Sequence, residues 1–515
     1  MNSPKIFALV TSLLLLNACG LLPPQAASQT TANSTVLSCT HYYRALSAII
    51  EENHVQDAQT TAIPGYPFLH ANRFLVGLKP HLDQEEQIVS WLNLSAQLAL
   101  QTHSIEINNL SPKASNELTA LSPDQWQHVP PALVLQRCSR TLLDNVRASP
   151  ETQRKILHNA NVPDDYHTWK RIEGLYPLMS FPVAVGIQRW HTKSRAVLRT
   201  PAAELAVAGT LLRYNVNTQS AYKSFAEVKA ALDVARQNAL DLPLPDDDTM
   251  ARLFATFAPV LEVDTVQSDD NIGAPQWLSH TQYAVINTAR PNVYTLTSHM
   301  VFNGTILLQL NYVVWFPSRP CTSSLDSLCG HMDGITWRVT LGADGKPLVY
   351  DSMHNCGCYH TFFPTRSLIA IPPPPITVES RTNLDERAFS PVHAPSLNPS
   401  QQLVVRIAHR THYIESIYVD EPTNNTRIPM VTMERKPYDT LRSLPVDSLQ
   451  RNRSLFTENA IVAGTQRKER WFFWPLGVPS AGAMRQWGNH ATAFIGRRHF
   501  DDPNLLDNAF IPANP

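Results

Sequence analysis

The chain has 515 residues, of which 43% are hydrophobic and 17% charged, so it is long enough for two or three domains and is not wholly disordered. Lys and Arg number 42 against 43 Asp and Glu, which gives a net charge of −1 and no expectation of a nucleic-acid partner. The 18 glycines are about half the usual share of ~7%, and no G-x-G-x-x-G, P-loop, G-x-S-x-G or H-E-x-x-H motif is present. The sequence therefore lacks the common nucleotide-binding and hydrolase motifs, and its composition indicates no function.

The first twenty residues have the pattern of an export signal. Lys5 precedes an apolar run over Ile6–Leu16, which suits the hydrophobic region of a signal peptide and is too short to span a bilayer as a helix. The run ends in the tetrapeptide Leu-Asn-Ala-Cys at Cys19, which resembles the lipobox of bacterial lipoproteins.

That resemblance implies that residues 1–18 are removed and that Cys19 is lipidated on its sulfur and acylated at its new amino terminus. Several acyl chains together give stable anchoring in a lipid bilayer. Gly20 follows the cysteine, and in lipoproteins this position, when it is not Asp, points to the outer membrane. We therefore expect a cell-envelope protein anchored in the outer membrane and facing the periplasm; the alternative is an ordinary secretory signal with an incidental cysteine.

Six further cysteines remain after Cys19. An even number in an exported chain favours disulfides over metal ligands. Two of them, Cys39 and Cys138, stand alone in the N-terminal half, so we predict that they are bridged. The other four lie close together and allow three connectivities: Cys321, Cys329, Cys356 and Cys358.

The residue pattern changes once along the chain, from helical to strand-like. Residues 19–38 are small and polar, as expected of a lipidated flexible tether, and residues 39–263 form a predicted helical domain. A predicted β-rich domain follows over residues 264–430, and residues 431–515 form a mixed extension. The expected fold class is α+β, with a helical domain followed by an antiparallel β-rich domain.

The residue pattern predicts four helices within the helical domain. Acidic residues after Asp83 open a long apolar run, and Ser122 is a good N-cap followed by proline. Residues 226–240 repeat apolar positions at helical spacing, and three aspartates after Pro245 suit the positive end of a helix.

Two hairpins are expected in the β-rich domain. Asn303-Gly304 lies between the strand-like runs 293–302 and 305–316, and this dipeptide is the strongest short hairpin signal. A second hairpin is expected over 334–341 and 346–353, with its turn at 342–345. Residues 402–418 form another strand-like run.

The second hairpin carries the main candidate site. With the turn centred on residues 343 and 344, Trp337 faces Tyr350 and Val339 faces Leu348, which buries one apolar row. Alternation then gathers a polar cluster on the same face at the open end of the hairpin. Its members are Cys329, His331, Asp333, His354, Cys356, Cys358 and His360.

Two interpretations of this cluster stay open. His331, Asp333, His354 and His360 are candidate ligands of a zinc or iron ion, and the first three are candidate catalytic residues. Alternatively, Cys329 bridges Cys356 or Cys358 and the histidines pack around this covalent clamp. We favour the clamp, because export favours oxidation and a straight strand would spread residues 354–360 over ~20 Å.

Two other segments contain candidate ligand residues. His409, His412 and Glu415 have helical metal-ligand spacing, but their strand-like flanks would point the two histidines apart. Residues 484–502 are dense in Arg, His and Trp, which suits a ligand or anion site. We favour an extension that packs its aromatic residues on the β domain and pairs arginines with Asp501 and Asp502.

The function expected from the sequence is that of a non-catalytic outer-membrane lipoprotein with a binding or envelope-structural role. Its partners are the lipid bilayer and a protein or small molecule that the sequence does not identify. The alternative is a periplasmic metal-dependent hydrolase that uses residues 331–360.

Overall fold

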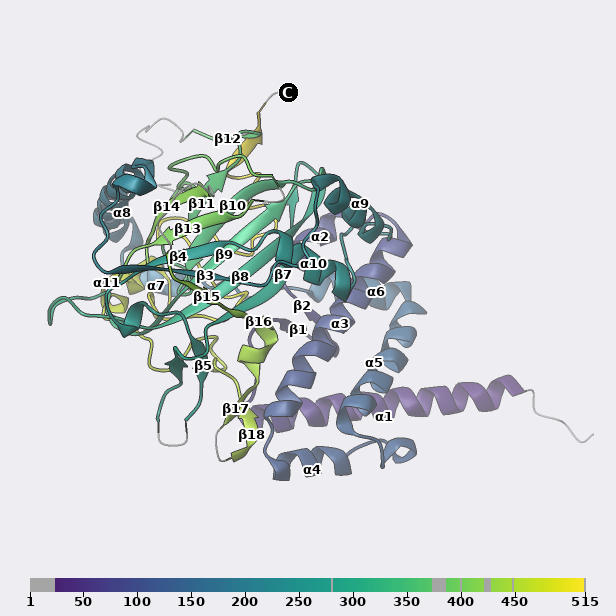
Figure 1. The fold of residues 1–515 in the computed structure, drawn as a ribbon. Coiled ribbons are helices and arrows are strands. Elements are labelled where there is room, and N and C mark those ends of the chain that lie inside the picture. The colour runs from purple at the N-terminus through teal and green to yellow at the C-terminus, as the bar shows by residue number, and fades with distance from the viewer. Residues whose placement is uncertain are drawn as a thin grey trace, which may run out of the picture.

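The computed structural model describes residues 24–278, 281–372, 386–398, 401–420, 428–446 and 449–513. The predicted signal peptide and the lipidation site Cys19 lie outside these residues. The described elements have an α+β arrangement, in which a group of helices lies beside a larger β unit (Figure 1). No helix within the described ranges is long and apolar enough to cross a membrane.

The helical unit is built around α3, which begins two residues after Asp83 and buries Trp91 and Leu92. Gln84 and Gln87 form a capping box at its start, which confirms the predicted helix. The predicted helix after Ser122 is only a 3₁₀ turn over Asp124–Trp126, and the next helix starts at a later proline, Pro131. The elements of this unit are α1 (Pro24–Glu52), β1 (Thr61–Ile63), β2 (Tyr66–Ala71), α2 (Arg73–Leu78), α3 (Glu85–Asn109), α4 (Pro112–Ala120), α5 (Pro131–Arg147) and α6 (Pro150–Asn159).

Helix α1 corrects the expected tether, because it already begins at Pro24 and continues through residues 24–38. Residues 25–38 contain no glycine or proline, so nothing in this stretch breaks a helix. The predicted bridge between Cys39 and Cys138 is confirmed: it joins α1 to α5, with 5.1 Å between the two Cα atoms.

The β unit contains two sheets that share one core. A six-stranded sheet has the order β11-β10-β9-β8-β7-β16, and a five-stranded sheet has the order β14-β13-β4-β3-β15. Leu310 and Trp337 of the first sheet and Leu261 and Val405 of the second belong to the same buried cluster. The strands of the six-stranded sheet are β7 (Asn292–Phe302), β8 (Thr305–Arg319), β9 (Gly330–Leu341), β10 (Pro347–His354), β11 (Thr361–Pro364) and β16 (Glu434–Pro437).

The five-stranded sheet draws on both predicted domains. The change of character expected at residue 264 falls inside β4, so β3 and β4 complete a sheet with later strands. The segment 402–418 is a hairpin of β13 and β14 rather than one strand. The strands of this sheet are β3 (Thr210–Asn215), β4 (Val260–Thr265), β13 (Leu403–Ile407), β14 (Ile414–Val419) and β15 (Met430–Thr432).

Helices and short strands cover the edges of the β unit. Two expected helices are present as α9 and α10, and Asp246 caps the second through its side chain. The C-terminal extension covers the outer face of the six-stranded sheet, where Trp487 and Phe500 pack in one cluster with Trp315, as predicted. These elements are α7 (Thr168–Glu173), α8 (Tyr176–Arg199), α9 (Phe225–Ala235), α10 (Asp247–Thr256), β5 (Ala274–Gln276), β6 (Val285–Asn287), β12 (Leu368–Ala370), β17 (Leu444–Val446), β18 (Leu449–Arg453), α11 (Arg470–Phe473) and β19 (Phe510–Pro512).

Both predicted hairpins are present, but the register of the second is wrong by two residues. The Asn303-Gly304 turn has φ of 48° and 71°, as the hairpin turn requires. In the second hairpin, Leu341 pairs with Pro347, which is a shift of one residue at the turn, and a bulge between Pro347 and Val349 adds the second, so Val339 pairs with Tyr350. A shift of two keeps the paired residues beyond the bulge on their predicted face, so Trp337 still stacks on Tyr350 with 5.7 Å between ring centroids. Cys356, Cys358 and His360 lie after the end of β10, and they are not on that face.

The predicted clamp between the hairpin strands is wrong. Cys329 is bridged to Cys321, eight residues earlier in the loop between β8 and β9. Cys356 and Cys358 are buried free thiols in the tight turn after β10, where Gly357 has φ of 90°. The loop therefore closes on itself before the chain enters β9.

Candidate functional site

Two predicted site residues, Asp333 and His354, meet inside the β unit. Oδ1 of Asp333 lies 3.4 Å from Nδ1 of His354. His412, from the turn between β13 and β14, donates a hydrogen bond from Nδ1 to Oδ2 of Asp333 at 2.9 Å. The imidazole of His412 also lies 3.6 Å from Asp270 and stacks on Phe316. The result is a buried chain of alternating imidazole and carboxylate groups, which we call the Asp333 cluster: His354, Asp333, His412 and Asp270.

The other predicted ligands lie elsewhere. Nε2 of His360 donates to Asp351 at 2.8 Å on the opposite face of the six-stranded sheet, where Arg338 also pairs with that carboxylate. Nε2 of His331 donates to the carbonyl of Ala284 at 2.7 Å. Among the described residues, no group of three or more His, Cys, Asp or Glu side chains is placed to hold a metal ion.

Burial and charge oppose each other in the Asp333 cluster. Burial disfavours the charged form of Asp333, but His354 and Arg467 outweigh it and hold the pKa of Asp333 well below its usual value. Burial lowers the pKa of His354, whereas the neighbouring carboxylates of Asp270 and Asp333 outweigh burial and raise the pKa of His412. The cluster is thus a set of charges that compensate one another inside the protein.

The Asp333 cluster has almost no room for a substrate. The cavity beside His354 measures about 30 Å³ and is lined by Trp190, Tyr359 and Tyr413. This is the volume of about one water molecule. Asp333 and His412 are also fully buried. The arrangement therefore stabilises the junction of the two sheets and does not present reactive groups to a ligand.

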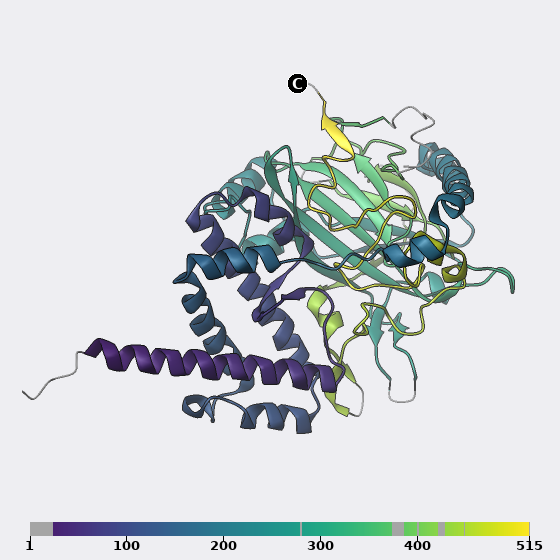
Figure 2. The same cartoon turned by 180° about the vertical axis from the view of Figure 1, so that it is seen from behind.

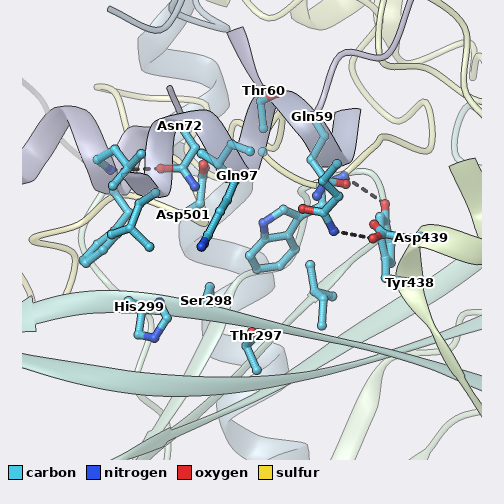
Figure 3. A pocket seen from close by; sticks show the side chains of 18 of the residues that line it. Gln59, Thr60, Asn72, Gln97, Thr297, Ser298, His299, Tyr438, Asp439 and Asp501 are labelled. Carbon is cyan, nitrogen blue, oxygen red and sulfur yellow. Dashed lines mark hydrogen bonds between the residues drawn. The ribbon is translucent and has the colours of Figure 1, made fainter. Parts of the chain in front are cut away.

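A larger cavity of about 370 Å³ lies where the helical unit meets the six-stranded sheet. Figure 3 shows Gln97 reaching from α3 toward Thr297, Ser298 and His299 of β7, while Asp439 closes one side. Its lining comes from both units and from the C-terminal extension. The polar lining residues are Gln59, Thr60, Asn72, Gln97, Gln101, Thr295, Thr297, Ser298, His299, Tyr438, Asp439 and Asp501.

Ionic contacts of the buried Arg442 tie the loop after α1 to the C-terminal extension beside this cavity. Arg442 donates to both carboxylate oxygens of Asp57 at 2.9 and 2.7 Å and to Asp439 at 2.8 Å. Asn72 accepts a hydrogen bond from the backbone N–H of Leu75 and so caps α2. These contacts fix the wall before any ligand arrives.

The sheet wall is fixed as well. Oγ of Ser298 donates to Gln309 and accepts a hydrogen bond from Asn311. Nε2 of His299 donates to the carbonyl of Pro243 at 2.9 Å, and burial lowers the pKa of His299 to about 4. His299 is therefore neutral at neutral pH, and its Nδ1 is a hydrogen-bond acceptor.

Two buried oxygens around the cavity have no hydrogen-bond partner: Oε1 of Gln59 and Oδ1 of Asp501. The Asp501 oxygen lies 3.3 Å from Nε of Arg73, which supplies an ionic contact without hydrogen-bond geometry. Burial raises the pKa of Asp501 in spite of Arg73. Buried polar atoms are normally paired, so these oxygens are available to a ligand or to bound water.

The charge of the lining restricts the ligand. Two carboxylates, one neutral imidazole and no lysine or arginine stand among the lining residues. An anion placed here would meet carboxylates with no cation in contact with it. A neutral molecule with hydroxyl or amide groups would find both donors and acceptors.

Only part of this cavity is predictable from the sequence. Residues 484–502 contain a candidate ligand site, and Trp487 and Asp501 of this segment line the cavity. Asp501 has an arginine partner as predicted, and this is Arg73 of the helical unit. The predicted arginine partner of Asp502 is wrong, because that carboxylate contacts His499 at 3.3 Å. The remaining lining residues are ordinary Gln, Thr, Ser and Leu side chains whose convergence only the folded chain reveals.

Comparison of the chain with protein-family models, with curated proteins and with solved structures finds no match.

Proposed function

We propose that this chain is a lipid-anchored binding protein of the bacterial envelope, held in the outer membrane through Cys19. The cavity between α3 and β7 takes a neutral small molecule that carries hydroxyl or amide groups. The observation that carries the binding role is the cavity of about 370 Å³, which is lined from both units and has polar groups on both walls. The lipobox-like sequence ending at Cys19 supports the anchor.

The size and chemistry of the cavity set the ligand class. Its volume lies near the lower end of the ~300–1,000 Å³ that is usual for small-molecule sites. Amide and hydroxyl groups occur on both walls, while Phe74 and Trp487 supply apolar surface. A sugar ring or a compact acylated amine has this combination of polar edges and an apolar face.

The test uses a matched pair of probes, N-acetylglucosamine and its 6-phosphate. We expect calorimetry to show binding of the neutral sugar and at least about tenfold weaker binding of the phosphate, because the lining offers carboxylates and no cation. Ser298→Trp should abolish binding by filling the cavity. Gln97→Leu, which keeps the side-chain shape, should weaken it.

Ser220→Trp is the matched control, since Ser220 is exposed and does not line the cavity. It should bind the sugar as the unmodified chain does. Unchanged binding by Ser298→Trp, or tighter binding of the phosphate than of the neutral sugar, would contradict the proposal.

A further inference from the structure

A second surface of the molecule is exposed, apolar and aromatic. It is formed by α7, α8 and the segment 471–474, and we call it the apolar patch. Among the described residues, every Trp and Phe classed as exposed lies on it, including Trp169, Phe181, Trp471 and Phe472. Monomeric proteins rarely expose contiguous apolar surface of this kind without a binding role.

Helix α8 shows that the exposure is systematic. Leu178, Phe181 and Val185 are spaced i, i+3 and i+7, so they lie on one stripe of the helix. Such a stripe normally faces the core, yet Leu178 is 68% and Phe181 66% exposed. The sequence of α8 is thus amphipathic, but its apolar stripe faces outward.

The parts of the patch are fixed to one another. The backbone N–H of His167 donates to the carbonyl of Gly477 at 2.8 Å, and Nε of Arg171 donates to the carbonyl of Leu476 at the same distance. Phe473 and Phe494 stack beneath with 4.4 Å between ring centroids. Trp471 and Phe472, at 67% and 64% exposure, therefore project from an ordered base.

Positive charge surrounds the patch. Arg189 and Lys193 are exposed further along α8, and Lys170 and Arg470 lie over the rings of Trp169 and Trp471. Glu173 is the one exposed acidic residue on α7, α8 or α11. This local excess of positive charge contrasts with the whole chain, whose net charge is −1. A second copy of the same patch would be repelled, whereas an anionic surface would be attracted.

We propose that the apolar patch docks on an anionic lipid surface. Interfacial helices combine Trp, Phe and Leu, which enter the boundary between headgroups and acyl chains, with Lys and Arg that contact anionic headgroups. An acidic protein would complement the positive charge of the patch. Its binding would not explain why exposed Trp and Phe side chains are spread over three helices.

This contact is independent of the proposed N-terminal anchor. The start of α1 and the group of α7, α8 and α11 lie at opposite ends of the molecule in both views (Figures 1 and 2). The patch would therefore meet lipid without help from the acyl chains. It can be tested in a Cys19→Ala chain, and its failure would leave the cavity proposal untouched.

The test is cosedimentation of the full Cys19→Ala chain with vesicles of phosphatidylglycerol and phosphatidylethanolamine, and with vesicles of phosphatidylcholine alone. We expect preferential binding to the anionic vesicles, with quenching of Trp fluorescence by brominated lipid. Replacing Leu178, Phe181, Trp471 and Phe472 together by Ser should lower partitioning at least about tenfold. Arg189→Glu with Lys193→Glu should remove the preference for anionic vesicles and serves as a second variant with less risk to folding.

The matched control replaces four other exposed apolar residues, which lie outside the patch, by Ser: Leu121, Val234, Leu325 and Ile369. The signal segment is common to all chains, so any binding that it contributes cancels in the comparison. Equal partitioning of patch and control variants would overturn the proposal. Absence of binding to anionic vesicles would overturn it as well and would point to a protein partner.

Discussion

Replacing Cys39 and Cys138 together by alanine is expected to lower the free energy of unfolding by about 4–5 kcal/mol. The bridge joins residues 99 positions apart, and in the chain-entropy model a closed loop of about that length restricts the unfolded chain by this amount. Both cysteines are fully buried between α1 and α5, so the loss falls on the core of the helical unit. Guanidinium unfolding, followed by circular dichroism, measures the change.

The chain contains its own control for this prediction. Cys321 and Cys329 are only eight positions apart, so the same model gives about 2.5 kcal/mol for their bridge. Their loop also includes exposed residues such as Leu325. If removal of the short bridge destabilises the protein as much as removal of the long one, the entropic argument fails.

Asp333→Asn is expected to destabilise the folded protein by about 3–5 kcal/mol at neutral pH. The carboxylate accepts a hydrogen bond from His412 and lies 3.4 Å from Arg467, and its loss leaves a buried guanidinium without compensation. The folded pKa of Asp333 is lowered, so this contribution is present above the unfolded pKa and is lost as pH falls through the folded one. The difference between the two proteins should therefore shrink toward acid pH.

Asp344→Asn is the matched control, because Asp344 is an exposed residue in the turn of the same hairpin. It should change stability by less than about 0.5 kcal/mol. An Asp333→Asn protein as stable at neutral pH as the Asp344→Asn protein would show that the cluster does not hold the two sheets together.

The parts of the fold that were predictable depend on local chemistry. The Asn303-Gly304 turn, the capped start of α3 and the Cys39–Cys138 bridge each follow from a few neighbouring residues or from simple exclusion. The second register was missed because alternation fixes the face of a strand but detects neither the length of a turn nor a bulge, here between Pro347 and Val349. For that reason Trp337 lies on its predicted face, but its paired residue is Ser352 and not Tyr350.

The candidate site was less predictable, because its contacts are long-range. Asp333 and His354 were placed together by the hairpin pattern, but His412 enters from a turn that the sequence showed as continuous strand. His360 does not join Asp333 and His354, because it bonds to Asp351, and alternation along the strand places Asp351 on the other face of the sheet. The large cavity draws residues from positions 59 to 501, a separation that no local pattern spans.

We propose that lipid on Cys19 holds this chain in the envelope, and the mass of the N-terminal peptide checks this anchor. Protein extracted from bacterial membranes should yield a peptide that begins at Cys19 and carries diacylglyceryl and acyl groups. The Cys19→Ala chain should lack this mass and should leave the membrane fraction or remain uncleaved. An N-terminal peptide that begins elsewhere, or an unmodified Cys19 in a chain that still sediments with membranes, would contradict the account.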